Sequence, residues 1–177
     1  MLERLLIAGS GGQGIVLVGK LIATIAVRDT PHVTFFPAYG AEVRGGTSHC
    51  QVILSSEEIA SPISEQFDSM IMMNQPSFER FLPEMTKNCL IIINSSMCEV
   101  PASPPTLAVN ATELAEQLGD TRIANFVMLG VYLAAKRIAS PTETEECIQR
   151  ILAGKNRTLI DLNIKAFRAG LTHPVKN

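Results

Sequence analysis

The sequence predicts a single α/β domain over residues 1–177, with a mostly parallel sheet and a helical C-terminal third. Short apolar runs that stop at glycine or at turn residues are typical of buried parallel strands. Apolar residues also recur at helical spacing, first between these runs and then through the last third of the chain. No repeat, low-complexity stretch or linker marks a domain boundary, and a chain of this length can form one core.

The first part of the chain has the pattern of a strand–helix–strand unit. The apolar run at residues 5–8 stops at Gly9, and the helical spacing that follows ends at a turn formed by residues 29–31. The elements expected here are a strand at 5–8, a helix at 15–27, a strand at 33–36, a loop at 37–47 and a strand at 48–54.

The rest of the chain is expected to add strands and then helices. Asn110 or Thr112 is the expected N-cap of the first of these C-terminal helices, and Gly170 is expected to end the last one in a left-handed conformation. The expected strands are 69–73, 90–93 and 106–109, and the expected helices are 77–85, 124–137, 142–152 and 157–169.

The composition of the chain argues against some classes of function. Charged residues make up 18% of the chain, below the ~25% of an average soluble domain, and the net charge is −2. The surplus of apolar residues predicts a large core and a surface covered by partner chains. The absence of a basic stripe argues against nucleic-acid binding. No apolar run approaches the ~18 residues of a membrane span, and the four apolar residues before Gly9 are too few for a signal peptide, so a cytoplasmic location is expected.

Reactive side chains are sparse. The cysteines match no zinc or iron–sulfur spacing, so we expect buried free thiols and place any metal cluster on another chain. The histidines have no evident partner, and no acid–base or nucleophile pair stands out, so no catalytic residue is assigned. These residues are Cys50, Cys89, Cys98, Cys147, His32, His49 and His173.

A glycine-rich turn links the first strand to the first helix and fits the G-x-G-x-x-G template. Glycine permits a close approach to the backbone, and free N–H groups at a helix start attract phosphate. The second strand ends without the carboxylate that a nicotinamide dinucleotide requires. A phosphate-bearing ligand other than a dinucleotide and a turn that serves packing alone both stay open. The candidate residues are Gly9, Gly11, Gly12, Gln13 and Gly14.

A second glycine-rich cluster follows the second strand. Arg44 offers a planar donor fork suited to carboxylate or phosphate, and the adjacent glycines let a backbone approach closely. An exposed pair of Glu42 and Arg44 with no function is the alternative. The candidate ligand-binding residues are Tyr39, Glu42, Arg44, Gly45, Gly46 and Ser48.

With these two clusters the sequence resembles the gamma subunit, or gamma domain, of the 2-oxoacid:ferredoxin oxidoreductases. That family carries Gly-x-Gly-Gly-Gln-Gly followed by Tyr-Gly-x-Glu-x-Arg-Gly-Gly-x-Ser, which stand here at residues 9–14 and 39–48. Further likenesses lie at residues 59–62, 124–130 and 162–170, and at Asp68. The resemblance covers nearly the whole chain.

The resemblance implies a Rossmann-like, three-layer fold in a non-catalytic subunit of an oxidoreductase. Such complexes oxidise a 2-oxoacid, such as pyruvate or 2-oxoglutarate, to acyl-CoA and reduce ferredoxin. It further implies alpha, beta and delta subunits as partners, with thiamine diphosphate and iron–sulfur clusters on those chains. Coenzyme A is the ligand that this chain is expected to help bind. The sequence does not indicate which 2-oxoacid is used.

Two alternatives compete with this interpretation. One is a stand-alone reductase that binds a dinucleotide at the glycine turn, against which the missing carboxylate argues. The other is a scaffold subunit whose glycine loops contact only other chains. We expect the two glycine clusters to form one anion-binding edge at the carboxyl ends of the strands.

Overall fold

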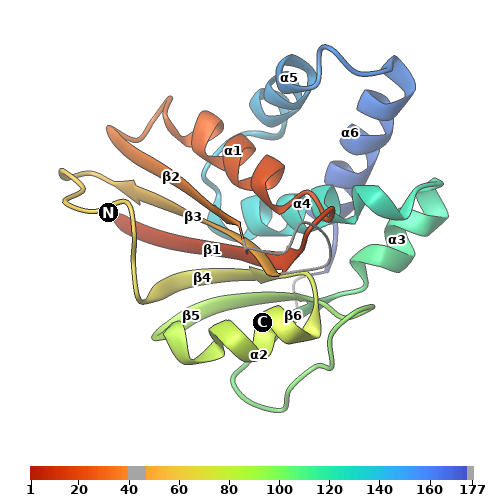
Figure 1. Cartoon of the computed structure of the whole chain (residues 1–177). Helices are drawn as coiled ribbons and strands as arrows, with labels where there is room; N and C mark the ends of the chain where they lie inside the picture. Colours follow the sequence, from red (N-terminus) through yellow and green to blue (C-terminus); the bar gives the residue numbers. More distant parts are fainter. Residues whose placement is uncertain (40–46, 175–177) are drawn as a thin grey trace.

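The computed structural model describes residues 1–39 and 47–174, which form a six-stranded sheet with helices on both faces (Figure 1). The strands are β1 (Leu2–Ser10), β2 (His32–Tyr39), β3 (Thr47–Ser55), β4 (Phe67–Met72), β5 (Met85–Asn94) and β6 (Thr106–Val109). The helices are α1 (Ile15–Ala26), α2 (Gln75–Phe81), α3 (Ala111–Leu118), α4 (Ala124–Lys136), α5 (Pro141–Ile151) and α6 (Arg157–Leu171). Two short 3-10 helices, η1 (Leu82–Glu84) and η2 (Thr121–Ile123), complete the list.

The strand order is β2-β3-β1-β4-β5-β6, and all strands except β3 run in one direction. Only residues 40–46 separate β2 from β3, and so short a connection joins antiparallel strands. The predicted α/β fold with a mostly parallel sheet and a helical C-terminal part is therefore confirmed. The strand–helix–strand unit is also present, but β3 lies between its two strands, which the sequence pattern did not predict.

The end of β2, around Pro37, differs from the sequence prediction. Residues 37–39 were expected to lie in a loop, yet β2 continues through Pro37 to Tyr39. Proline lacks the N–H of a central strand but is tolerated at a sheet edge. Because β2 is the edge strand next to β3, the strand continues past Pro37.

Gly170 marks a second difference. It was expected to end the last helix in a left-handed conformation, but α6 runs through it to Leu171. That prediction was wrong because the glycine serves a helix–helix contact instead. A Cβ on Gly170 would meet the backbone of Val127 and lie 3.0 Å from Cα of Gly130 in α4. The two glycines thus let the backbones of α4 and α6 approach closely.

The sheet separates two apolar layers, as alternation along β1 shows. Leu5 and Ile7 pack toward α1, α4 and α6, whereas Leu6 and Ala8 pack toward α2. All four side chains are at most 1% exposed. This burial on both faces explains why the strand reads as a continuous apolar run. No helix within the described ranges is both long and apolar enough to cross a membrane.

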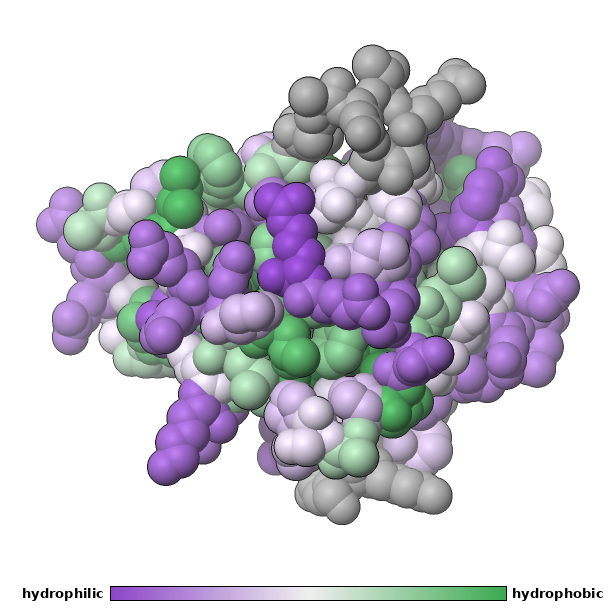
Figure 2. All heavy atoms as spheres, turned by 60° about the horizontal axis from the view of Figure 1, so that its bottom comes forward, coloured by the Kyte–Doolittle hydropathy of each residue, from purple (hydrophilic) through white to green (hydrophobic). Residues whose placement is uncertain are grey.

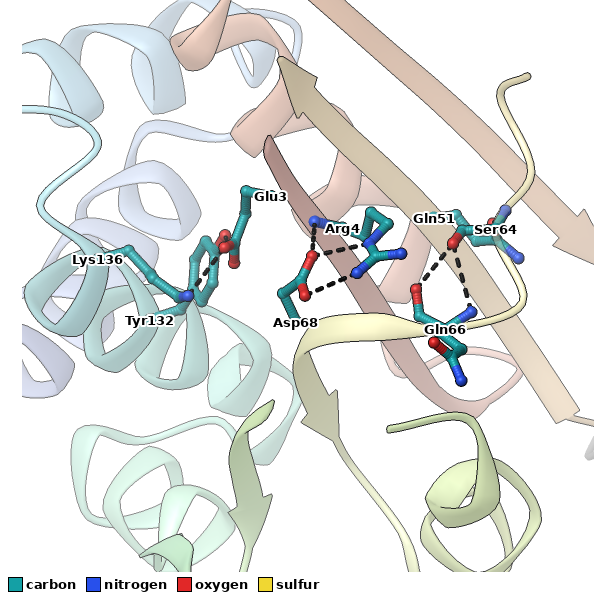
Figure 3. Close-up of polar contacts among 8 residues, drawn as sticks. All are labelled: Glu3, Arg4, Gln51, Ser64, Gln66, Asp68, Tyr132 and Lys136. Atoms are coloured by element: carbon teal, nitrogen blue, oxygen red, sulfur yellow. Dashed lines mark hydrogen bonds and ion pairs between the residues drawn. The ribbon is translucent and has the colours of Figure 1, made fainter. Parts of the chain in front are cut away.

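Polar contacts of Glu3 connect the amino end of β1 to α4 (Figure 3). Glu3 accepts hydrogen bonds from Lys136 Nζ, at 2.9 Å, and from the hydroxyl of Tyr132, at 3.3 Å. Burial raises the pKa of Tyr132 well above its usual value, and the Glu3 carboxylate adds to the effect. Tyr132 therefore stays protonated and can donate to Glu3.

Arg4 and Asp68 form a two-pronged ion pair between β1 and β4 (Figure 3). Arg4 Nε and Nη2 donate to the Asp68 carboxylate at 2.8 and 2.9 Å. The hydrogen bond from the Arg4 side chain is the main cause that lowers the pKa of Asp68, opposed by partial burial. A lowered carboxyl pKa stabilises the fold above the unfolded-state value, and this stability is lost as pH falls through the folded-state value.

We therefore expect Asp68→Asn to flatten the acid side of the stability profile. The free energy of unfolding of the native chain should fall as pH drops below the ~3.9 of an aspartate in an unfolded chain, because the folded-state pKa of Asp68 is lowered. At pH 7 the variant should be less stable than the native chain. On acidification its free energy of unfolding should fall by less than that of the native chain, as denaturant titrations at each pH will show. Equal acid slopes for the two proteins would contradict this account of the pair.

Candidate functional site

The carboxyl ends of β1 and β4 meet at the point where the connections diverge. From β1 the chain passes through α1 to β2 on one side, and from β4 it passes through α2 to β5 on the other, with α1 and α2 on opposite faces (Figure 1). Ligands of open α/β sheets bind at such switch points. Here Met73 N donates to the Ala8 carbonyl at 2.9 Å, and Asn74 Nδ2 donates to Ser10 Oγ at 2.5 Å.

The glycine turn at the end of β1 is held by Gln13. Ser10 N donates to Gln13 Oε1 at 2.7 Å, and Gln13 N donates to the Ser10 carbonyl at 3.1 Å. Gly9 faces this side chain, and a Cβ there would also lie 2.8 Å from Met73 Cβ. Gly9 and Gln13, both expected to bind ligand, thus have identifiable structural tasks within the turn.

The remaining glycines leave the backbone accessible at the start of α1. Gly12 and Gly14 have φ of +95° and +73°, a conformation that favours glycine. Gly11 and Gly12 are exposed, and Gly14 caps α1 without a side-chain hydrogen bond. The first N–H groups of a helix have no partner within it and carry the positive end of its dipole. The turn therefore presents an electropositive backbone surface to solvent.

Asn125 connects this turn to α4. Its Nδ2 donates to the Gly14 carbonyl at 3.3 Å, and its Oδ1 accepts from Phe126 N at 3.0 Å. The side chain is buried, and a Cβ on Gly14 would collide with it. Asn125 thus fixes the start of α4 against the start of α1, a role that the sequence pattern did not reveal.

The second glycine cluster begins and ends at the same edge of the sheet. Ser48 on β3 lies opposite both Gly9 on β1 and Tyr39 on β2. Ser48 also shares a strand face with Cys50, whose thiol contacts the Ile15 carbonyl of α1 at 3.5 Å. The predicted residues Glu42, Arg44, Gly45 and Gly46 lie outside the described residues.

His49 lies on the opposite face of β3 from Ser48. Its ring packs against that of Phe81 in α2, with centroids 4.9 Å apart. Burial lowers the pKa of His49, and the charge of nearby Arg80 lowers it further, so the ring is neutral at pH 7. This contact gives His49 a packing role between β3 and α2.

A pocket of about 210 Å³ opens beside the glycine turn. Met73 and Met97 supply apolar walls, and Arg122 contributes a cation. Arg122 is 81% exposed at its side chain, and its Nε and Nη2 donate to Asp120 at 2.9 and 2.6 Å. Sequence reasoning missed Arg122, because nothing in the segment before α4 indicates that it folds back beside Gly12.

The cysteines show no cluster-binding arrangement. All are free, and burial is the main cause that raises the pKa of Cys50 to about 12 and of Cys89 and Cys98 to about 11. Among the residues that the structure describes, no three His, Cys, Asp or Glu side chains converge as metal ligands. The residues present here do not fit an iron–sulfur cluster.

Sequence comparisons find relatives along nearly the whole chain. Ketoisovalerate oxidoreductase subunit VorA of Methanothermobacter thermautotrophicus is 36% identical over 94% of this chain and 35% of its own length. 2-Oxoglutarate synthase subunit KorC of Archaeoglobus fulgidus is 28% identical over 93% of this chain and 83% of its own length. The chain thus spans 35% and 37% of the two VorA relatives that it matches.

Solved structures share the fold. The gamma subunit of keto/oxoacid ferredoxin oxidoreductase from Geobacter sulfurreducens superposes with a TM-score of 0.79, at 25% identity over 96% of this chain and 94% of its own. The 2-oxoglutarate:ferredoxin oxidoreductase from Magnetococcus marinus, bound to 2-oxoglutarate, coenzyme A and succinyl-CoA, gives 0.86, at 23% identity over 96% of this chain and 30% of its own.

The model of one protein family, pyruvate ferredoxin/flavodoxin oxidoreductase, matches residues 4–173. This range includes all six α-helices. It also includes every strand, apart from the first two residues of β1. It also includes both glycine clusters that carried the resemblance in the sequence. The chain therefore belongs to the pyruvate ferredoxin/flavodoxin oxidoreductase family.

Proposed function

We propose that this chain is the gamma subunit, or gamma module, of a multi-subunit 2-oxoacid:ferredoxin oxidoreductase and helps bind coenzyme A. The observation that carries the proposal is the exposed backbone of Gly11 and Gly12 at the start of α1, placed at the switch point beside a pocket. Backbone N–H groups in this position bind phosphate oxygens. Coenzyme A is a phosphate-bearing substrate of the acyl-CoA-forming reaction.

In this proposal the chain binds and orients coenzyme A, while partner subunits carry out the chemistry. Thiamine diphosphate and the iron–sulfur clusters belong to alpha, beta and delta chains, and ferredoxin accepts the electrons. The N-terminus of α1, together with Arg44 of the second glycine-rich cluster, binds the phosphate groups of coenzyme A. The thiol end is then free to reach the acyl group on a partner chain.

Exposed apolar side chains support contacts with such partners. Ile63, Met97 and Val100 are each at least 50% exposed. Figure 2 shows the α2 side of the molecule brought forward, where apolar patches interrupt the polar surface. Covering such side chains is favourable at ~25 cal/mol per Å² of apolar surface. We assign this surface to subunit contacts in a cytoplasmic complex.

A stand-alone dinucleotide-dependent reductase is disfavoured by the strand order. In a dinucleotide-binding fold the second strand lies beside the first, so that its terminal carboxylate reaches the ribose. Here β3 separates β2 from β1, which moves the end of β2 outward by about 4.8 Å. The strand also ends at Ala38 and Tyr39, with no carboxylate.

Arg44→Ala in the purified complex tests the ligand role of the second cluster. We expect the Kd for coenzyme A to rise about tenfold, because a charge-assisted contact to phosphate is lost. Calorimetric titration without 2-oxoacid measures binding separately from turnover. Lys87→Ala is the control, since it removes a positive charge from an exposed position on the amino half of β5, toward the opposite edge. Equal affinity in the Arg44 variant and the native complex would remove Arg44 from the site.

The subunit role has its own test. The tagged chain, isolated anaerobically from its native cells, should co-purify with larger partner chains. The isolated complex should reduce ferredoxin when a 2-oxoacid is added. A panel of 2-oxoacids then identifies the substrate. Isolation of the chain alone, with no associated 2-oxoacid oxidation, would contradict the proposal.

A further inference from the structure

A groove of about 390 Å³ lies at the amino end of β1, at the opposite end of that strand from the glycine turn. Its walls come from β1, from the end of β3 and from the segment 56–66 that follows β3. Met1, Leu2 and Ile63 line it and are 72%, 56% and 51% exposed. Single exposed apolar side chains are ordinary, but a group of them rimmed by polar residues marks an interaction site.

The segment 56–66 is held in place by polar contacts (Figure 3). Ser64 N donates to Oε1 of the buried Gln51 on β3 at 2.8 Å. The Ser61 hydroxyl accepts from Ile63 N at 3.2 Å and donates to the Ile63 carbonyl at 3.0 Å. These contacts order the backbone around Ile63 while its side chain stays exposed. The groove is therefore formed in advance, and a ligand that binds there pays little to order it.

The charges at the groove indicate what kind of ligand it fits. Arg4 is paired with Asp68, and the amino group of Met1 donates to a serine hydroxyl. Glu57 and Glu58 are exposed, and neither forms an ion pair within residues 1–39 and 47–174. An apolar side chain flanked by Lys or Arg complements both the apolar walls and these carboxylates. The same carboxylates disfavour an anionic lipid surface.

We infer that this groove docks a segment of a partner subunit that combines an apolar anchor with basic residues. The anchor packs against Leu2 and Ile63, and the basic side chains lie against Glu57 and Glu58. The inference rests on the proposed function, which supplies the partner subunits, and assigns one of their contacts to a defined place on this chain. Because the groove and the glycine turn lie at opposite ends of β1, docking here leaves the turn accessible.

Dilution of the purified complex, followed by native mass spectrometry, tests the apolar part of the inference. Ile63→Ser should raise the Kd for release of this chain about tenfold. Val27→Ser is the matched control, because Val27 is 63% exposed at the end of α1, on the other face of the sheet. It should release at the native concentration. Both side chains are exposed, so the Tm of each isolated variant should stay close to that of the native chain.

Salt dependence tests the electrostatic part. Association of the native complex should weaken as salt rises, because exposed charges are screened. The double variant Glu57→Gln with Glu58→Gln should associate more weakly at low salt and should lose most of that dependence. A benzophenone amino acid in place of Ile63 should crosslink to a partner peptide, which mass spectrometry will identify. That peptide should carry Lys or Arg beside an apolar residue.

Several results would overturn the docking groove. The Ile63→Ser complex would dissociate like the native one, or the crosslinker would capture a lipid, a second copy of this chain or nothing. An acidic or wholly polar crosslinked peptide would contradict the stated chemistry. If larger subunits co-purify with the chain but none is crosslinked from position 63, the proposed function stands and the groove fails. If the tagged chain is isolated alone, both fail.

Discussion

Gly12→Asp is expected to weaken coenzyme A binding to the complex about 100-fold more than Gly12→Asn does. The two side chains have nearly the same shape, and both tolerate the positive φ that Gly12 adopts. A Cβ at this position meets nothing within 4 Å, so neither substitution disturbs packing. The pair therefore isolates the effect of one negative charge at the start of α1.

Calorimetry at two salt concentrations gives the measurement. The difference between the variants should shrink as salt rises, because exposed charges are screened. In thermal unfolding the Asp variant should be no less stable than the Asn variant, because a negative charge near a helix start is favourable. A loss of coenzyme A binding that is equal in both variants would mean that shape, and not charge, matters at Gly12. That result would argue against phosphate binding at the turn.

Gly170→Ala is expected to destabilise the chain strongly. The new Cβ would collide with the backbone of Val127 and lie 2.9 Å from its carbonyl carbon, so the backbones of α4 and α6 would have to move apart. Overpacking of this kind costs about 3 kcal/mol, or a fall in Tm of about 6–12 °C in a chain of this size. Thermal and denaturant unfolding will measure the change.

Two companion variants sharpen this prediction. Gly154→Ala adds the same methyl group where nothing lies within 4 Å, and it should leave stability within about 0.5 kcal/mol of the native chain. Gly130→Ala disturbs the same helix contact from the other side, so the double variant with Gly170→Ala should lose less than the sum. Full additivity would show that the two glycines do not share one contact.

Local sequence patterns predicted most of the secondary structure because their causes are local. The buried strands appeared as apolar runs, and the strand Thr106–Val109 has the predicted bounds. The helix expected at 77–85 is split into α2 and η1 because Pro83 lacks the N–H of a regular helical turn. The family resemblance carried by the two glycine clusters was also correct.

The missed features depend on contacts between distant parts of the chain. Nothing in residues 47–55 themselves indicates that they insert between β1 and β2. Gly170 looks like a helix terminator until its approach to Val127 is known. Arg122 and Gly12 line the same pocket although more than a hundred residues separate them. Strand order, close helix packing and site assembly are long-range properties that residue spacing does not encode.

Hydrogen exchange of the assembled complex, with and without coenzyme A, tests the central claim most directly. The first amides of α1 have no partner within the helix and exchange quickly unless something binds them. The account predicts that saturating coenzyme A slows exchange at residues 11–17 and leaves α5 unchanged. Exchange at residues 11–17 that is identical with and without the ligand would contradict a phosphate site at this turn.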